Sequence, residues 1–532
     1  MALRDFFVLM LTVGWIVGSA GVCAQDTAAG EQTVVSPAFD ILEYRVEGNT
    51  VLPVLAIEKA VYPHLGPGRS IEDVEKARAA LERAYQSGGY LTVFVDIPEQ
   101  KVQGGVVRLR VTEGKVERLR VSGNRYYSRG FIRTGAPSLE AGAVPYFPQV
   151  QKELAQLQSP TRKITPVLKP GREPGRVEVE LQVEDKPPVR AEVELNNRQS
   201  PNTEPLRLQA SGGFDNLWQR DHSVSVFAQT APQETESLLV VSGTYLMPLG
   251  EKDRLAFFAV KSDSDVAAIG DVSVLGAGTI LGARLVRPLR PRERYFHSLT
   301  LGVDYKDFDE TTRLQGADNF ETPISYTPML VQYGGSYFGD KGATEGSVGL
   351  NFLVRSELLG NTDEEFENKR FKAKASYAFL RADLQRDQRL PRGLVLSTKL
   401  GVQYAGQPLI SNEQFAAGGL ETVRGYLEAE QTGDNGLLAR LELRSPNLSR
   451  WLGGRVNELT LVGFLEGAHL TIEDPLPGQI DNFTLAGTGM GLRLRAFSHL
   501  DGWLDVGIPL EDATFTERYD PRVHFRLAYQ FF

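Results

Sequence analysis

The last eleven residues of the chain, "RVHFRLAYQFF" (522–532), carry the pattern that decides the fold. Apolar and polar side chains alternate along this stretch, and alternation with a period of two predicts a β-strand with one apolar face. His524, Arg526 and Gln530 lie on the polar face. The apolar face consists of Val523, Phe525, Leu527, Tyr529 and Phe531. Such a face suits contact with lipid, and it also suits the core of a soluble β-sandwich.

The same alternation reaches back to about residue 188. "VRAEVELNNR" (189–198) alternates strictly, and strand-like runs recur from there to the end of the chain. We count about 16 such runs in roughly 345 residues, a spacing that suits membrane-spanning strands of about 9–11 residues. No segment of this region has the pattern of a helix.

The connectors between these runs are alternately short and long. "PLGEKD" (248–253) and "PLRPRER" (288–294) are short, whereas "SELLGNTDEEFENKR" (356–370) and "GAHLTIEDPLPGQIDN" (467–482) are long. Short turns on one rim and long loops on the other are typical of bacterial membrane barrels, and a β-sandwich does not explain them. The sequence therefore predicts a membrane all-β barrel of about 16 antiparallel strands over 188–532. Its terminal aromatic residue, Phe532, is one position out of register with the alternation.

The first 24 residues have the pattern of a secretory signal peptide. A short charged start, an apolar core and a small-residue cleavage site follow one another there. A membrane anchor is the alternative, but the apolar core is shorter than the roughly 20 residues of a span. Lipidation at Cys23 is a second alternative. Cleavage after Ala24 would remove the only cysteine and leave a short linker, 25–38.

Two related segments lie between this linker and the barrel. "RVEGNT" begins at Arg45 and "RVSGNR" at Arg120, and each follows a short strand-like stretch. Helix and strand patterns then recur in the order β-α-α-β-β in both copies. In the first copy, Ser70 and Asp73 form the pattern of a capping box at the start of a helix. We expect two small α/β domains over 39–114 and 115–187.

Composition and motifs argue against several classes of function. The net charge is −9, whereas nucleic-acid binding normally needs a basic surface. The six histidines have no metal-ligand spacing, and no nucleophile motif of the G-x-S-x-G type occurs. The glycines of "VLGAGTILGAR" (274–284) miss the spacing of a dinucleotide-binding loop. We therefore expect no enzyme, no cofactor, no metal and no nucleic-acid partner.

The repeat followed by the barrel resembles a known superfamily. The two small domains, with "GN" after the first strand of each, resemble POTRA domains, which are periplasmic modules of outer-membrane transporters. A generic pair of α/β domains is the alternative. Nearly the whole chain after the signal resembles two-partner secretion transporters of the haemolysin/filamentous-haemagglutinin type. The resemblance implies an outer-membrane barrel with its POTRA domains in the periplasm.

One connector, at about 406–434, contains "GGLETVRGYLEAE" (418–430) and would be the sixth outer loop. Val423, Arg424, Gly425 and Tyr426 resemble the motif at the tip of this loop in the superfamily. The resemblance implies that the loop folds back into the pore and that its arginine meets an acidic residue of the barrel wall. The family pattern Phe-x-Asp-x-Gly maps onto Phe464, Glu466 and Ala468, which makes Glu466 the candidate partner. The alternative is that Arg424 is a solvated loop charge, the usual state of a loop arginine.

The resemblance also implies the function and the partners. Such transporters export one large secreted cargo protein, whose N-terminal secretion domain the POTRA domains recognise. Outer-membrane lipid and the barrel assembly machinery, which would insert this chain, are the other expected partners. The alternatives are an assembly factor that inserts other barrels, which shares the superfamily, and a passive porin. Because only about 14 residues lie between the predicted cleavage site and Phe39, we expect no plug helix, so that loop 406–434 alone would close the pore.

Overall fold

The computed structural model describes residues 38–531 apart from 236–237, 251, 264–265, 270–271, 276, 310, 314–318, 355–361 and 452–454. The predicted signal peptide, nearly all of the predicted linker and Phe532 lie outside these residues. The described chain forms two compact units. The first comprises 38–119, 138–153 and 168–179, and the second comprises 120–137, 154–167 and 180–531. The domain bounds at 114/115 and 187/188 stay predictions.

The first repeat has the expected α/β pattern. Its sheet has the order β2-β5-β4, with β2 parallel and β4 antiparallel to β5. The helix α2 begins after Ser70, whose backbone N–H donates to Asp73 (3.2 Å), as the capping box predicts. The elements are β1 (Phe39–Ile41), β2 (Glu43–Glu47), α1 (Val54–Val61), η1 (Tyr62–His64), β3 (Gly66–Arg69), α2 (Ile71–Ser87), β4 (Val93–Asp96) and β5 (Val106–Glu113).

The second repeat has the same succession of helices and strands, apart from β1 and β3, which form a separate two-stranded sheet in the first repeat and have no counterpart among the described residues of the second. Its sheet has the order β6-β8-β7, so the last strand again lies in the centre. The elements are β6 (Lys115–Ser122), α3 (Arg129–Thr134), η2 (Pro137–Leu139), α4 (Phe147–Gln156), β7 (Arg162–Pro170) and β8 (Arg176–Asp185).

The repeated Gly-Asn turn has the same structure in both copies. Gly48 and Gly123 have φ values of 91° and 82°, a region that favours glycine. A carboxylate at the end of the central strand then accepts backbone N–H groups just after the turn. Glu113 accepts from Thr50 (2.6 Å), and Asp185 accepts from Tyr126 (2.8 Å). The repeat in the sequence therefore encodes one tight turn, which ties the first strand to the central strand.

Replacing Gly48 by alanine is expected to destabilise the first domain by about 2–3 kcal/mol, because strained backbone and a steric clash add together. A Cβ atom at this position would lie 2.3 Å from the carbonyl oxygen of Val111. Limited proteolysis of the full chain in detergent should show faster cleavage within 39–114. Gly104→Ala is the matched control, since Gly104 also has positive φ (62°) but open space around it. Equal protection of both variants would contradict the steric argument.

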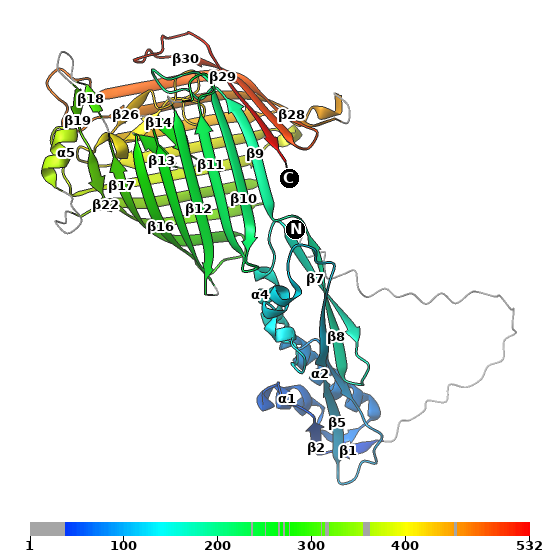
Figure 1. Cartoon of the computed structure of the whole chain (residues 1–532). Helices are drawn as coiled ribbons and strands as arrows, with labels where there is room; N and C mark the ends of the chain where they lie inside the picture. The colour runs from blue at the N-terminus through cyan, green and yellow to red at the C-terminus, as the bar shows by residue number, and fades with distance from the viewer. Residues whose placement is uncertain are drawn as a thin grey trace. The chain divides into compact units, whose positions relative to one another are not determined.

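The rest of the described chain forms a closed antiparallel barrel of sixteen strands, as predicted (Figure 1). β20 and β21 both pair with β17 and count as one interrupted strand, and β31 pairs with β9 to close the cylinder. The strands are β9 (Val189–Asn196), β10 (Arg207–Leu217), β11 (His222–Thr230), β12 (Leu239–Leu249), β13 (Asp253–Ser262), β16 (Gly278–Pro288), β17 (Tyr295–Phe308), β20 (Ile324–Tyr326), β21 (Met329–Gly339), β22 (Gly342–Leu353), β23 (Tyr377–Arg389), β24 (Val395–Tyr404), β27 (Asn435–Arg444), β28 (Val456–Thr471), β29 (Asn482–Ala496), β30 (Leu500–Pro509) and β31 (Arg522–Gln530).

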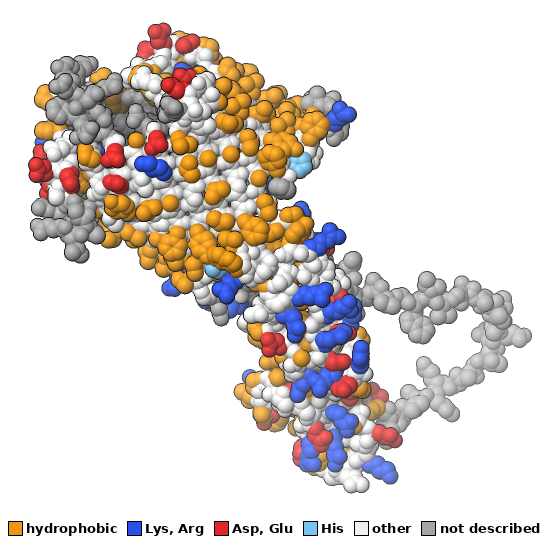
Figure 2. Space-filling view, viewed as in Figure 1, with side chains coloured by type: hydrophobic (Ala, Val, Ile, Leu, Met, Phe, Trp, Pro, Cys, Tyr) orange, Lys and Arg blue, Asp and Glu red, His pale blue; other side chains and the backbone are white. Residues whose placement is uncertain are grey.

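The barrel strands have an apolar outer face and a more polar inner face. On β31, Val523, Leu527 and Tyr529 are exposed on the outside, whereas His524 is buried inside, as the alternation predicts. Figure 2 shows hydrophobic side chains spread over the outer wall of the barrel. Because water-exposed surfaces rarely hold apolar patches of this extent, this wall is the lipid-facing surface. Among the described residues, no helix is long and apolar enough to span a membrane.

The expectation that the barrel region contains no helix is wrong at one place. α5 (Asp363–Lys369) forms in a long connector, with a capping box of Thr362 and Glu365 at its start. Seven residues are too few for a clear helical period, so the acidic sequence looks like an ordinary loop. Two hairpins also lie in the long connectors: β14 (Val266–Ile269) with β15 (Val272–Leu275), and β18 (Thr311–Arg313) with β19 (Asn319–Glu321).

Candidate functional site

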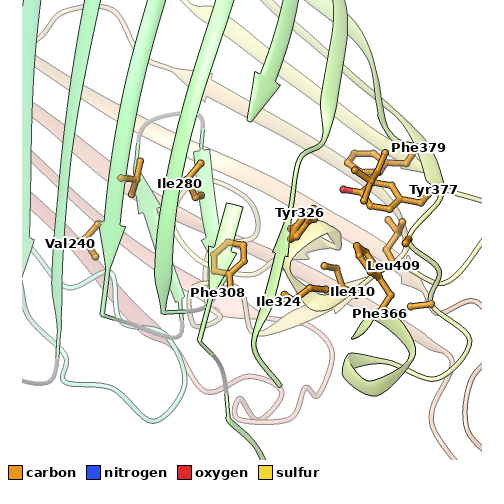
Figure 3. Packing of buried hydrophobic residues seen from close by; sticks show 14 residues of the cluster. Val240, Ile280, Phe308, Ile324, Tyr326, Phe366, Tyr377, Phe379, Leu409 and Ile410 are labelled. Carbon is orange, nitrogen blue, oxygen red and sulfur yellow. The ribbon is translucent and has the colours of Figure 1, made fainter. Parts of the chain in front are cut away.

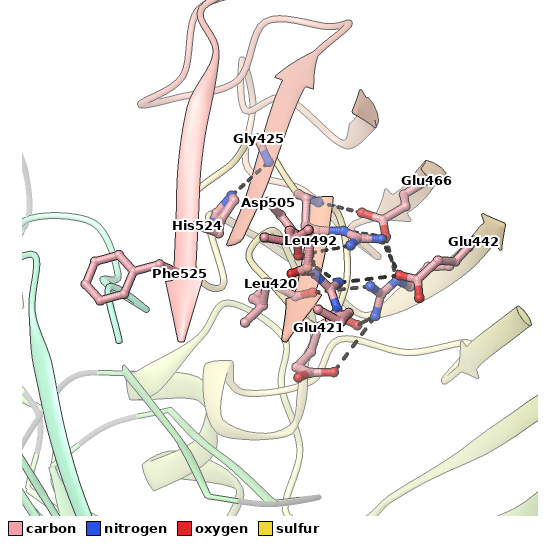
Figure 4. A network of polar contacts seen from close by, with 12 residues as sticks. Leu420, Glu421, Gly425, Glu442, Glu466, Leu492, Asp505, His524 and Phe525 are labelled. Carbon is pink, nitrogen blue, oxygen red and sulfur yellow. Dashed lines mark hydrogen bonds and ion pairs between the residues drawn. The ribbon is translucent and has the colours of Figure 1, made fainter. Parts of the chain in front are cut away.

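The connector between β24 and β27, which we call loop 6 (405–434), folds against the inner wall of the barrel. It contains η5 (Ser411–Glu413) and a small hairpin of β25 (Phe415–Ala417) and β26 (Gln431–Gly433). Most of its residues are buried. Its tip meets the inner faces of the last four strands, β28 to β31 (Figure 4).

Arg424 lies at the centre of this contact and is only 1% exposed. Its Nε donates to Glu466 Oε1 (2.9 Å), and its backbone N–H donates to Glu466 Oε2 (2.7 Å). The two Nη atoms donate to Asp505 (3.1 Å) and to Glu442 (3.0 Å). The guanidinium also stacks on Phe464, 3.5 Å from the ring centroid. A planar donor with five N–H groups suits this shared arrangement, which a lysine cannot reproduce.

Each carboxylate of the wall has an arginine of the wall as a second partner. Arg440 donates to Glu466 (2.9 Å), and Arg493 donates to Asp505 (2.9 Å). Arg444 donates to Glu442 (2.8 Å). Arg440 also reaches the loop and donates to the backbone oxygens of Leu420 and Glu421. The result is a buried network of alternating charges, in which Arg424 is the member that the loop contributes.

The wall next to Arg424 is built from small residues. Gly487 and Gly507 belong to β29 and β30, and the loop backbone lies directly on them. A Cβ atom on Gly507 would lie 2.5 Å from the backbone nitrogen of Gly425, and one on Gly487 would lie 2.4 Å from the carbonyl oxygen of Arg424. Any larger side chain at these two positions would occupy the space of the loop.

The neighbours of Arg424 in the motif also contact the wall. The Gly425 N–H donates to Nε2 of His524 (3.0 Å), so Nε2 must carry a lone pair and the proton lies on Nδ1. The Tyr426 hydroxyl lies within hydrogen-bond distance of the backbone oxygens of Ala486 (2.9 Å) and Glu511 (2.8 Å), and its single proton is donated to one of them at a time. Val423 is fully buried. All four motif residues therefore lie against the inner wall of the barrel, and Gly425 (φ 104°) makes the turn that orients them.

Two further carboxylates attach loop 6 to neighbouring loops. Glu428 accepts from Arg198 Nε (3.0 Å), in the connector after β9. Glu430 accepts from the backbone of Phe515 (3.0 Å) and the hydroxyl of Thr516 (2.6 Å), in the connector before β31. These contacts hold the tip close to both ends of the barrel sequence.

The structure brings Arg424 and Glu466 together, as the resemblance implies, and it does not support the alternative of a solvated arginine. The functional role of the pair stays a prediction. Sequence reasoning missed Asp505, Glu442 and the three arginines of the wall. A signal existed for Arg440, Glu442 and Asp505, because each is a charged strand residue followed by an exposed apolar residue of the outer wall.

Three features together define the class of outer-membrane transporters with POTRA domains. These features are a closed barrel with a lipid-facing wall, an arginine-containing loop docked in its lumen, and a pair of small α/β domains before the barrel. A family model described as haemolysin secretion/activation protein ShlB/FhaC/HecB matches residues 175–494, more than half of the chain. A model described as POTRA domain, ShlB-type, matches residues 39–114. The chain belongs to the ShlB/FhaC/HecB family, and its location is the outer membrane.

Named relatives agree with this family. The outer membrane transporter CdiB of Dickeya dadantii is 22% identical over 479 residues, which cover 83% of this chain and 78% of the relative. The heme/hemopexin transporter protein HuxB of Haemophilus influenzae is 19% identical over 390 residues, 72% of this chain and 67% of the relative. The structure of CdiB from Escherichia coli is similar with a TM-score of 0.66 at 19% identity, covering 95% of this chain and 93% of that chain.

Proposed function

We propose that this protein is the outer-membrane pore of a two-partner secretion system, which exports one large partner protein to the cell surface. The observation that carries the proposal is the inward-folded loop 6, whose Arg424 is held by three carboxylates of the barrel wall. A passive porin needs neither a loop anchored so deeply nor two periplasmic domains before the barrel.

In this proposal the two small domains capture the N-terminal secretion domain of the cargo in an extended state. Three-stranded sheets such as β2-β5-β4 have edge strands with unpaired backbone groups. An extended peptide can add to such an edge, where main-chain hydrogen bonds give affinity and side-chain contacts give selectivity. No nucleotide-binding motif occurs in the sequence, so folding of the cargo outside the cell is the proposed source of direction.

The cargo would then pass through the barrel, and loop 6 would have to move aside. A polar cavity of about 430 Å³ adjoins the tip of the loop and is lined by loop residues and by charged side chains of the wall. This space is the proposed route of the extended chain past Arg424. The protein would depend on the barrel assembly machinery for its own insertion and on outer-membrane lipid as its solvent.

Deleting the gene and comparing the proteins of the medium and of the outer membrane tests the proposal. We expect one large exported protein to disappear from the surface and the medium, while other barrel proteins keep their amounts. Loss of many different barrel proteins would instead support the role of an assembly factor. Unchanged protein profiles together with reduced uptake of a small solute would support a porin.

A further inference from the structure

Loop 6 has a second anchorage before it reaches Arg424. Glu413, at the end of η5, is buried and accepts from Lys306 Nζ (2.5 Å) and from the hydroxyl of Tyr326 (2.7 Å). Lys306 belongs to β17 and Tyr326 to β20, far in sequence from the strands that hold Arg424. The Lys306 ammonium also lies 5.7 Å from the centroid of the Tyr326 ring. The Glu413–Lys306 pair is therefore an ion pair that is largely buried in the protein.

The two anchorages lie on opposite walls of the barrel. β17 is the seventh of the sixteen strands in order around the cylinder, and β30, which carries Asp505, is the fifteenth. Strands that are half the circumference apart face each other across the lumen of a closed barrel. The segment from Glu413 to Arg424 is therefore attached to both walls, because the Glu413 side chain reaches β17 whereas Phe415 and Val423 pack against β27–β29.

Apolar side chains surround the Glu413 anchorage near the strand ends that carry the long loops (Figure 3). Phe308 and Tyr326 contribute from the wall, Phe366 contributes from α5, and Leu409 and Ile410 contribute from loop 6 itself. A buried charge in such surroundings is costly without its charged partner. Lys306 and Glu413 consequently hold each other in place.

We propose that the Glu413–Lys306 pair is a second latch, which keeps loop 6 across the pore independently of Arg424. The inference rests on the proposed function, since it assumes that loop 6 closes the pore. The Arg424 network fixes the tip of the loop to β28–β31, and the Glu413 latch fixes its stem to β17. The loop can leave the lumen only after both attachments have been released, so each latch contributes its own factor to the closed state.

Ion conductance of the purified full chain in planar lipid bilayers tests the latch without any cargo. We expect Glu413→Gln and Lys306→Met each to raise the fraction of time spent in the open state about tenfold, the ratio that corresponds to 1.4 kcal/mol. Combining both changes should raise it no further than the larger single effect, because both remove the same interaction. Adding Arg424→Ala to either variant should multiply the two effects.

Lys372→Met is the matched control. Lys372 also pairs with a carboxylate, Asp474 (2.7 Å), but both side chains are about half exposed and lie in outer loops. We expect its conductance to equal that of the unchanged protein, and the altered electrophoretic mobility on heating should show that every variant is a folded barrel. Conductance of Glu413→Gln and Lys306→Met equal to that of Lys372→Met would overturn the latch, as would fully additive effects of the two changes.

The outcome is separate from that of the proposed function. A protein that exports no cargo would still show the conductance changes if loop 6 closes the pore through two latches. Conversely, a failed latch would leave the export experiment unaffected.

Discussion

Arg424→Ala is expected to leave the barrel in the membrane, to open it to ions and to impair export of the cargo. Removing one partner of a buried charge pair costs about 3 kcal/mol, or roughly a hundredfold in the ratio of docked to undocked loop. The barrel should persist because Glu466 and Asp505 keep Arg440 and Arg493 as partners. Bilayer conductance, the amount of cargo in the medium and the amount of heat-modifiable barrel in the outer membrane are the measurements.

Two companion variants sharpen this prediction. Arg424→Lys keeps the charge but cannot reach Glu442, Glu466 and Asp505 together, so we expect a defect close to that of alanine. Arg287→Ala is the control, because Arg287 makes a bidentate ion pair with Asp253 and its own side chain is exposed. It should behave like the unchanged protein. Normal cargo release by Arg424→Ala would contradict the role given to the loop.

Gly507→Val is expected to have an effect of similar size through space alone. Its Cβ would lie 2.5 Å from the Gly425 nitrogen and 2.7 Å from the Arg424 carbonyl carbon, so the tip could not occupy its place on the wall. The clash involves backbone, which has little freedom to yield, and overpacking costs of this kind are about 1–3 kcal/mol. We expect raised conductance and reduced export although every charged residue is still present.

Gly463→Val is the matched control for this variant. Gly463 is also a glycine of a barrel strand, β28, but it adjoins the inward-facing Phe464 and has open space around its Cβ position. Its added methyl groups would face lipid, so conductance and export should not change. If both valine variants had the same defect, the cause would be strand flexibility and the steric account would fail.

Much of the fold could be predicted because its signals are local. Alternation along strands, the lengths of the connectors and the repeated Gly-Asn turn are each visible within a short stretch of sequence. The contact between Arg424 and Glu466 could also be anticipated, since the motif residues and Phe464 resemble a family pattern. The Glu-for-Asp exchange lengthens the side chain by one methylene, and Glu466 still reaches both the guanidinium and the Arg424 backbone.

The rest of the site depends on register between strands, which no single stretch of sequence encodes. Asp505 lies in "WLDVGIPL" (503–510) and Arg493 in "GTGMGLRLR" (487–495), yet their pairing requires that β29 and β30 be aligned by tertiary contacts. The contact between Glu413 and Lys306 cannot be predicted for the same reason, because Lys306 is 107 residues earlier in the chain. Helix α5 shows no clear period because it has only seven residues, and the burial of Phe366 that stabilises it is a tertiary contact.

The pairing of β31 with β9, which closes the cylinder, is linked to the position of loop 6. β31 and β9 share five residue pairs, whereas each of the other neighbours around the barrel shares at least eight among the described residues, if β20 and β21 are taken together. Loop 6 contacts both sides of this shortest strand pairing, through His524 in β31 and Arg198 in the connector after β9. A displacement of loop 6 that breaks these two contacts would leave the five residue pairs between β31 and β9 without this support, so we expect the closure of the cylinder to weaken when the loop moves.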